Sequence, residues 1–172
     1  MKQHQEKIWF WFDEARFGTH SKIGYGWFPK GKRTSIKIKL GFQNFYVYTA
    51  IRVDRGEHFS LIMPYVNGIC MNIFLQKLSK RIGKRKAVLV MDQAGWHKGK
   101  ELIVPSNIMI IYLPPYSPEL NPVERFWEHT QANVLKNKIY SSFDSLEATV
   151  CNFINSISRP EIKSLCAYNL LN

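Results

Sequence analysis

Cysteine is scarce in this chain, and its scarcity excludes several classes of protein. The three cysteines, Cys70, Cys151 and Cys166, are odd in number and lack metal-type spacing, so neither a disulfide framework nor a zinc knuckle is indicated. A reducing cytoplasm is the natural compartment for such a chain. No apolar run approaches the roughly 20 residues that cross a bilayer. The first residues do not resemble a signal peptide, and the chain lacks internal repeats and low-complexity tracts.

Acidic residues are also few. The chain has 13 Asp and Glu against 24 Lys and Arg, which gives a formal net charge of +11. A domain this basic typically binds a polyanion such as nucleic acid, because Lys and Arg displace counterions from phosphates. The alternative is a charge that serves only solubility. With 172 residues, 45% of them hydrophobic, the chain is large enough for one domain with a substantial core.

The first half carries the patterns of β-strands. Residues 8–12 are all apolar, which is typical of a strand buried on both faces, and we expect Asp13 and Glu14 to end it. Those two acids are either buried beside cationic partners or simple turn residues. Alternating and apolar runs predict further strands over residues 35–40, 45–53 and 59–63, which would form an antiparallel meander.

Helical spacing begins near residue 67. A helix is expected to be capped by Asn67 or Asn72 and closed by Gly83, with a basic cluster at its end that is usually a solvated face. The remaining expected elements are a strand over 87–91, a short helical segment over 98–104, a strand over 109–113, a helix from Pro122 to about 138, and a helix that starts at Ser141–Ser142 and ends at Pro160.

A proline-rich stretch over residues 113–124 is the most distinctive part of the sequence. Asn121 followed by Pro122 predicts an abrupt helix start, so that Glu124 in the first turn is held at a fixed angle. The bland alternative is that Glu124 is only the capping-box partner of Asn121.

Two apolar strands, 8–12 and 87–91, are each followed by an aspartate, Asp13 or Asp92. Asp92 could be only a helix cap and His97 only a surface histidine. However, ligands gather at the carboxyl ends of parallel strands, where Asp13 and Asp92 would meet and Glu124 could join them. Three carboxylates with open positions suit Mg²⁺ or Mn²⁺.

Three blocks make a family recognisable. Residues 12–17 (FDEARF), 90–98 (VMDQAGWHK) and 113–124 (LPPYSPELNPVE) resemble the signature blocks of DDE transposases of the IS630 and Tc1/mariner superfamily. The resemblance implies an α/β, RNase H-like fold: a mixed five-stranded sheet, with an antiparallel meander followed by parallel strands and helices on both faces. It implies that Asp13, Asp92 and Glu124 are the catalytic, metal-binding triad.

The resemblance also implies an organisation. Residues 1–172 would be a single catalytic domain, with a core over about 8–140 and C-terminal helices over 141–172. Family members carry a helix-turn-helix DNA-binding region before the first aspartate, and only a dozen residues precede Asp13 here. We therefore expect that region to be absent from this chain, with a separate chain as one source of it. The interval between Asp92 and Glu124 is also shorter than is usual in the family.

The implied activity is cleavage of phosphodiester bonds at transposon ends and transfer of the 3′ hydroxyl to target DNA. Two Mg²⁺ or Mn²⁺ ions would serve each active site. Cut-and-paste movement, insertion at TA dinucleotides, double-stranded DNA partners, a homodimer when active and a cytoplasmic, nucleoid-associated location follow from the same resemblance. The alternatives are a non-catalytic DNA-binding remnant and a general RNase H-like nuclease.

Supporting roles are expected for residues near the triad or in the glycine-rich, basic connection over residues 18–33. Glu14, Arg16 and His97 could orient ligands or touch phosphate, with ordinary surface or packing roles as the alternative. Glu119 and Glu128 are rival third ligands. The other candidates for orienting ligands or contacting DNA are Lys98, Asn121, Lys30, Lys32 and Arg33.

Overall fold

A mixed five-stranded sheet forms the centre of the computed structural model, which describes residues 7–19, 30–31, 43–95 and 101–167. The strand order is β3-β2-β1-β4-β5. β1 pairs antiparallel with β2, and β2 with β3, whereas β1–β4 and β4–β5 are parallel. The predicted mixed sheet is therefore confirmed. The strands are β1 (Ile8–Gly18), β2 (Asn44–Arg52), β3 (Glu57–Met63), β4 (Ala87–Met91) and β5 (Ile108–Tyr112).

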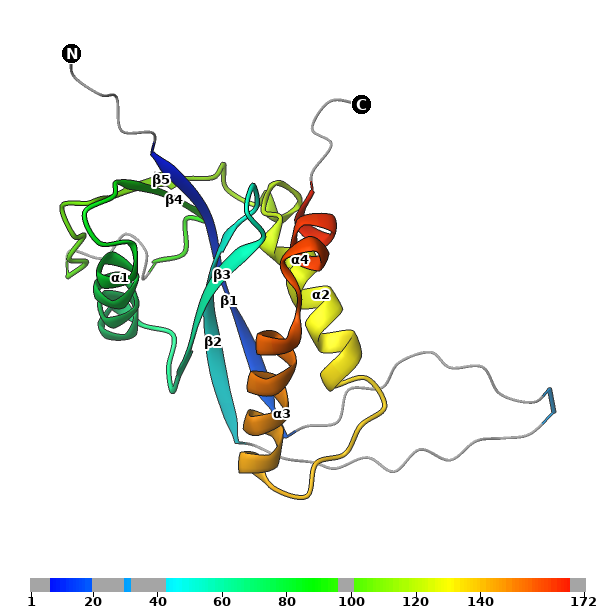
Figure 1. The fold of residues 1–172 in the computed structure, drawn as a ribbon. Coiled ribbons are helices and arrows are strands. Elements are labelled where there is room, and N and C mark those ends of the chain that lie inside the picture. The colour runs from blue at the N-terminus through cyan, green and yellow to red at the C-terminus, as the bar shows by residue number, and fades with distance from the viewer. Residues whose placement is uncertain (1–6, 20–29, 32–42, 96–100, 168–172) are drawn as a thin grey trace, which may run out of the picture.

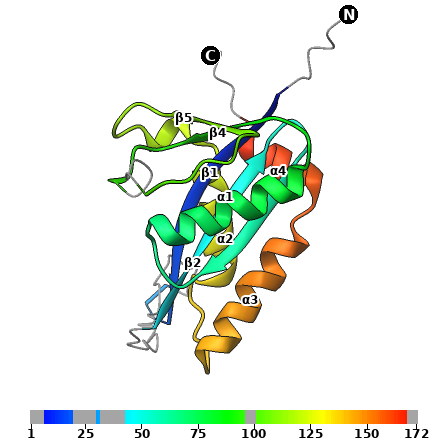
Figure 2. The same cartoon turned by 90° about the vertical axis from the view of Figure 1, so that its left-hand side faces the viewer.

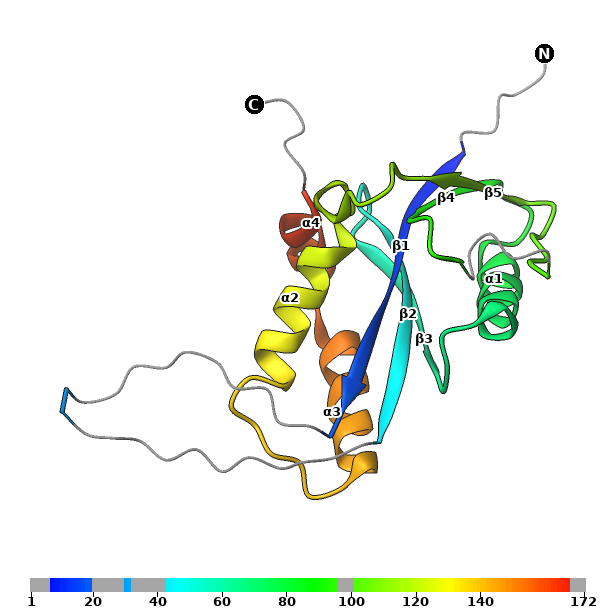
Figure 3. The same cartoon turned by 180° about the vertical axis from the view of Figure 1, so that it is seen from behind.

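Helices cover both faces of this sheet (Figure 1). The helix α1 (Gly68–Ile82) lies on one face, and α2 (Val123–Val134), α3 (Phe143–Ser156) and α4 (Arg159–Cys166) lie on the other. Figure 2, turned by 90°, shows α1 running across its face of the sheet, and Figure 3 shows the opposite layer from behind. No helix in the described ranges is long and apolar enough to cross a membrane.

Alternation along β1 divides its side chains between two cores. Phe10 and Phe12 pack in the core under α1, whereas Ala15 and Phe17 pack in the core under α2, α3 and α4. The expectation that residues 8–12 are buried on both faces is wrong at Trp9, which is 51% exposed.

The prediction that Asp13 and Glu14 end the first strand is also wrong. β1 continues to Gly18 because β2 pairs with it along that whole stretch, from Trp11 opposite Ile51 to Gly18 opposite Asn44. Ladder hydrogen bonds therefore hold the acids inside a strand rather than in a turn. The strand expected over residues 35–40 lies outside the described residues.

Local capping chemistry sets the limits of α1, as predicted. The Asn67 side chain accepts a hydrogen bond from the backbone N–H of Cys70 (2.9 Å), and Gly83 closes the helix with a φ of 64°. The helical segment expected over 98–104 is not helical at 101–104. Asn72 instead holds this segment against α1, with its Nδ2 donating to Glu101 O (2.9 Å) and its Oδ1 accepting from Ile103 N (2.8 Å).

The C-terminal helices differ from prediction at their ends. α2 ends at Val134 rather than near 138, and the chain turns at Asn137, whose φ of 57° is left-handed. Ser142 caps α3 as expected, but α3 ends at Ser156. Pro160 lies in the first turn of a further helix, α4, where a missing N–H is harmless.

Candidate active site

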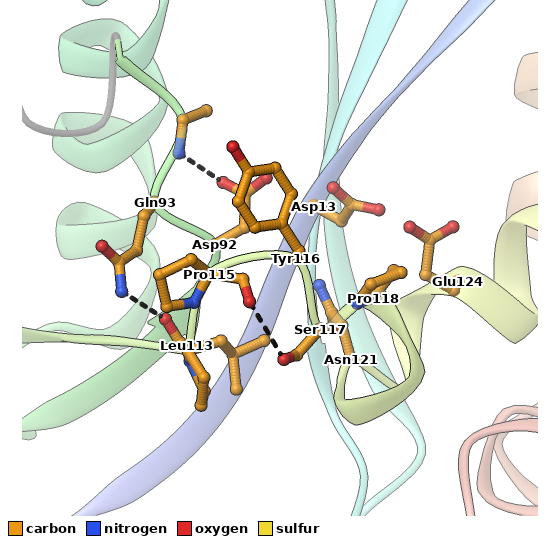
Figure 4. Close-up of a pocket in the computed structure, with 12 residues that line it drawn as sticks. Asp13, Asp92, Gln93, Leu113, Pro115, Tyr116, Ser117, Pro118, Asn121 and Glu124 are labelled. Carbon is orange, nitrogen blue, oxygen red and sulfur yellow. Dashed lines mark hydrogen bonds between the residues drawn. The ribbon is translucent and has the colours of Figure 1, made fainter.

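Three acidic residues from separate elements line one cavity of about 420 Å³. Asp13 lies within β1, Asp92 directly follows β4, and Glu124 lies in the first turn of α2. Figure 4 shows their carboxylates around the cavity together with the loop that precedes α2. The structure thus brings the three predicted acids to one place.

The register of the parallel strands explains why the aspartates meet. β1 and β4 run side by side, and Trp11 is paired with Val90. Asp13 and Asp92 each follow that pair by two residues, and a period of two returns a side chain to the same face of the sheet. Beyond this point β1 continues beside β2 alone, while the chain leaves β4. The cavity therefore opens where the two parallel strands part.

Asn121 joins the start of α2 to β1. Its buried side chain donates from Nδ2 to Phe12 O (2.9 Å), the carbonyl immediately before Asp13, and accepts at Oδ1 from Val123 N (3.2 Å). The 3₁₀ turn η2 (Pro118–Leu120) precedes it, and Asn121 N donates to Pro118 O (2.9 Å). Because that N–H is already used, Glu124 does not form the capping box, and its side chain lines the cavity instead.

Burial and like charge act together on two of the acids. The pKa of the Asp13 carboxyl is raised well above its usual value, first by burial and then by the negative charges of Glu14, Glu124 and Asp92. Burial also raises the pKa of Glu124, with further contributions from Glu128 and Asp92. Carboxyl groups that repel one another in this way favour either a proton or a bound cation.

The opposite wall of the cavity is more open. Asp92 is exposed, and its Oδ1 accepts a hydrogen bond from Ala94 N (3.1 Å) in a tight turn. Gln93 donates from Nε2 to Leu113 O (2.7 Å), which joins this turn to the end of the β5 segment. Sequence reasoning missed Gln93, for which adjacency to Asp92 was the available signal. It also missed Tyr116 in the loop before α2, since only the coordinates reveal that its ring stands at the cavity.

The other candidates are distributed differently. Glu14 is the neighbour of Asp13 in β1, and its charge acts on Tyr48, which packs in the core under α1. The pKa of Tyr48 is raised first by burial and then by the negative charge of Glu14. Arg16 and Lys30 are exposed and do not line the cavity. Neither do Glu119 and Glu128, the rivals of Glu124. The remaining candidates lie outside the described residues: His97, Lys98, Lys32 and Arg33.

The donor set fits a hard divalent cation in chemistry. Carboxylate oxygens are the ligands that Mg²⁺ and Mn²⁺ prefer, and a cation among these acids would relieve the repulsion that raises the pKa values of Asp13 and Glu124. Among the described residues, no group of three or more His, Cys, Asp or Glu side chains is already drawn together as a metal site. The three acids therefore line an open cavity rather than a closed cage.

A mixed sheet with this strand order and with helices on both faces defines an RNase H-like fold. The chain belongs to the DDE superfamily of endonucleases, whose family model matches residues 8–147.

Two curated relatives are similar to this chain. The protein y4pE/y4sA of Sinorhizobium fredii, itself uncharacterised, is 36% identical over 113 residues, which are 65% of this chain and 84% of that protein. A 39 kDa protein of insertion element IS630 from Shigella sonnei is 25% identical over 154 residues, 87% of this chain but 45% of that protein. The chain thus spans less than half of the IS630 protein.

Solved structures of the Mos1 mariner transposase share the fold. The Mos1 paired end complex with Mn superposes with a TM-score of 0.71 at 13% identity, over 93% of this chain and 52% of that one. The catalytic domain of Mos1 gives a TM-score of 0.63 at 12% identity, over 96% of this chain and 78% of that one. At such identities the likeness establishes the fold.

Proposed function

We propose that this chain is the catalytic domain of a DNA transposase that cleaves phosphodiester bonds at transposon ends and transfers the 3′ hydroxyl to target DNA. The observation that carries the proposal is the convergence of Asp13, Asp92 and Glu124 on one cavity. Membership of the DDE endonuclease superfamily and likeness to an IS630 protein support the reaction class.

The three carboxylates would hold two Mg²⁺ or Mn²⁺ ions. When bound, such ions would supply Lewis-acid stabilisation of the attacking and leaving oxygens of an in-line displacement. The Mos1 paired end complexes solved with Mn and with Mg support this choice of metal. The chain itself contributes position: Asp13 is fixed in the ladder of β1, and Asn121 holds the helix that carries Glu124.

No protein nucleophile is needed in this reaction. Water attacks the phosphorus at the transposon end and displaces the 3′ oxygen, which leaves as a 3′ hydroxyl. That hydroxyl then attacks a phosphodiester of the target DNA and displaces the target's own 3′ oxygen. Mos1 has been solved as a strand transfer complex and as a paired-end complex with the left transposon end, which supports double-stranded DNA as the partner. Cut-and-paste movement, TA target sites, a homodimer when active and a helix-turn-helix region on a separate chain belong to the same proposal.

Plasmid nicking tests the chemistry. The 172-residue chain is incubated with supercoiled plasmid and Mg²⁺ or Mn²⁺, and Asp92→Asn is compared with Glu119→Gln, a matched change at an exposed acid outside the cavity. Nicking that survives Glu119→Gln and is lost in Asp92→Asn supports the proposal. Salt-sensitive DNA binding without nicking contradicts it and identifies a DNA-binding remnant. Preferential cleavage of an RNA–DNA hybrid would favour a general nuclease.

A further inference from the structure

Tyr116 stands at the mouth of the carboxylate cavity with its side chain fully exposed. Its relative exposure is 100%, and it lines the cavity together with Asp13, Asp92 and Glu124. Figure 4 shows its ring among these acids. A large aromatic side chain gains nothing for the fold in such a position, because it buries no surface against the core.

The backbone at Tyr116 is unusual in the same way. Its φ of 57° is left-handed, a conformation that disfavours residues with a Cβ. Pro115 followed by the positive φ of Tyr116 gives the pattern of a type II turn. Glycine or asparagine normally occupies the position that Tyr116 has in such a turn. Ser117 Oγ donates to Pro115 O (3.3 Å) across the turn. A strained backbone that carries an exposed aromatic ring beside the carboxylate cavity points to a ligand for that ring.

The loop around Tyr116 is stiff rather than adaptable. Pro114, Pro115 and Pro118 each fix a φ angle, and Asn121 joins the end of the loop to β1. The backbone that carries the ring is therefore held in advance near the acids, so little backbone entropy is lost when a flat partner stacks on the ring.

Resting on the proposed function, we propose that Tyr116 stacks on an unpaired nucleobase of the DNA strand whose phosphate occupies the carboxylate cavity. A base inside a duplex has both faces covered by its neighbours, so only an unpaired or unstacked base can lie flat on the ring. Stacking tolerates any base, because every base has a π face. Tyr116 would thus select strand ends or frayed sites rather than a sequence.

The test uses two changes in the protein and one in the DNA. Tyr116→Phe keeps the ring and removes the hydroxyl, whereas Tyr116→Ala removes both. Tyr65→Ala is the matched control, since Tyr65 is also exposed, at 65%, and does not line the cavity. The probes are a short DNA duplex with a single-stranded 3′ flap and the same DNA with an abasic residue at each flap position in turn. Binding is measured by fluorescence polarisation with Ca²⁺, another hard cation, in place of Mg²⁺.

We expect Tyr116→Ala to weaken binding of the intact flap by roughly 5- to 150-fold, the range for loss of one base–aromatic stack. Tyr116→Phe and Tyr65→Ala should each change it by less than about twofold. One abasic position should weaken binding to the unchanged protein by a similar factor and weaken binding to Tyr116→Ala no further. Such coupling identifies the base that meets the ring.

Other outcomes overturn the inference. An equal abasic penalty in Tyr116→Ala and the unchanged protein would show that no base meets the ring. A loss in Tyr116→Phe as large as in Tyr116→Ala would assign the effect to the hydroxyl. If the unchanged protein nicks plasmid but shows no coupling, stacking fails and the proposed function stands. If it neither nicks nor binds DNA, both fail. Thermal unfolding should be the same in all the variants, because both rings are exposed.

Discussion

The two walls of the carboxylate cavity are built differently. One wall belongs to the core: Asp13 lies in the middle of β1, and Asn121 joins that strand to the helix that carries Glu124. The other wall is a surface turn, in which Asp92 is exposed and bonded to Ala94 N, and Gln93 reaches Leu113 O. The inner wall is fixed by the same contacts that fix the sheet, whereas the described contacts of the outer wall include one bond within the Asp92 turn and one to the chain just after β5.

This difference separates the roles of the acids. The inner acids, Asp13 and Glu124, are partly buried among other negative charges. Burial and this repulsion raise their pKa values. The outer acid meets solvent. We infer that the inner wall presets the cation site at a cost to the fold, and that the outer wall completes the site at little cost.

Asp13→Asn should produce the largest effects and should move activity and stability in opposite directions. Loss of partners that merely orient a metal ligand costs about 10- to 100-fold, so removal of Asp13, a ligand in the proposed function, should lower plasmid nicking by more than about 100-fold. The pKa of Asp13 is raised in the folded state, so the folded protein loses stability as pH rises from the usual value of 3.8 through the raised value. At neutral pH, the neutral amide should therefore increase the free energy of unfolding measured with EDTA.

Asp92→Asn sharpens the comparison. Nicking should fall as in Asp13→Asn, but the free energy of unfolding should change little because Asp92 is exposed. Mg²⁺ should raise the melting temperature of the unchanged protein and raise it less in either variant. If Asp13→Asn destabilises the metal-free protein, the inner wall does not carry the cost that we assign to it.

The second prediction concerns protons released when metal binds. Mn²⁺ must displace protons from carboxyls whose pKa is raised, so its affinity should fall as pH falls through those values, by up to about tenfold per pH unit for each proton displaced. Calorimetry in two buffers of different ionisation enthalpy gives the proton count. Glu124→Gln should lower that count, because it removes a carboxyl group of the cavity whose pKa is raised. An unchanged count would mean that Glu124 does not bind the ion.

Local patterns in the sequence were enough for much of this architecture. Gly83 and Ser142 mark helix ends through bonds to residues only a few positions away, so the sequence predicts them, and it narrows the cap of α1 to Asn67 or Asn72, of which the structure has Asn67. The meeting of Asp13 with Asp92 followed from two apolar runs and one rule about parallel strands.

The failures involve partners distant in sequence, backbone angles that residue types do not reveal, or a proline that fits two local patterns. β1 continues past Asp13 because β2, about 30 residues later, pairs with it. Residues 101–104 are not helical because Asn72 holds their backbone. Pro160 reads equally as a helix stop or as a helix start, and only the cap at Ser158 decides. Nothing in the sequence predicts the left-handed φ at Tyr116, since tyrosine rarely adopts that conformation.

The third prediction compares the hydrogen bonds that hold the two walls. Asn121→Ala removes two buried hydrogen bonds, the one that Asn121 donates to Phe12 O and the one that it accepts from Val123 N. This change should lower the free energy of unfolding by about 1–3 kcal/mol. Gln93→Ala removes a partly buried donor to Leu113 O and should cost at most about 1 kcal/mol. Denaturant unfolding measures both. Because Asn121 also aims Glu124, its loss should weaken Mn²⁺ binding even where the protein is still folded. If Gln93→Ala weakened Mn²⁺ binding as much as Asn121→Ala, then the outer turn would position the ion as firmly as the core does, and the contrast between the walls would fail.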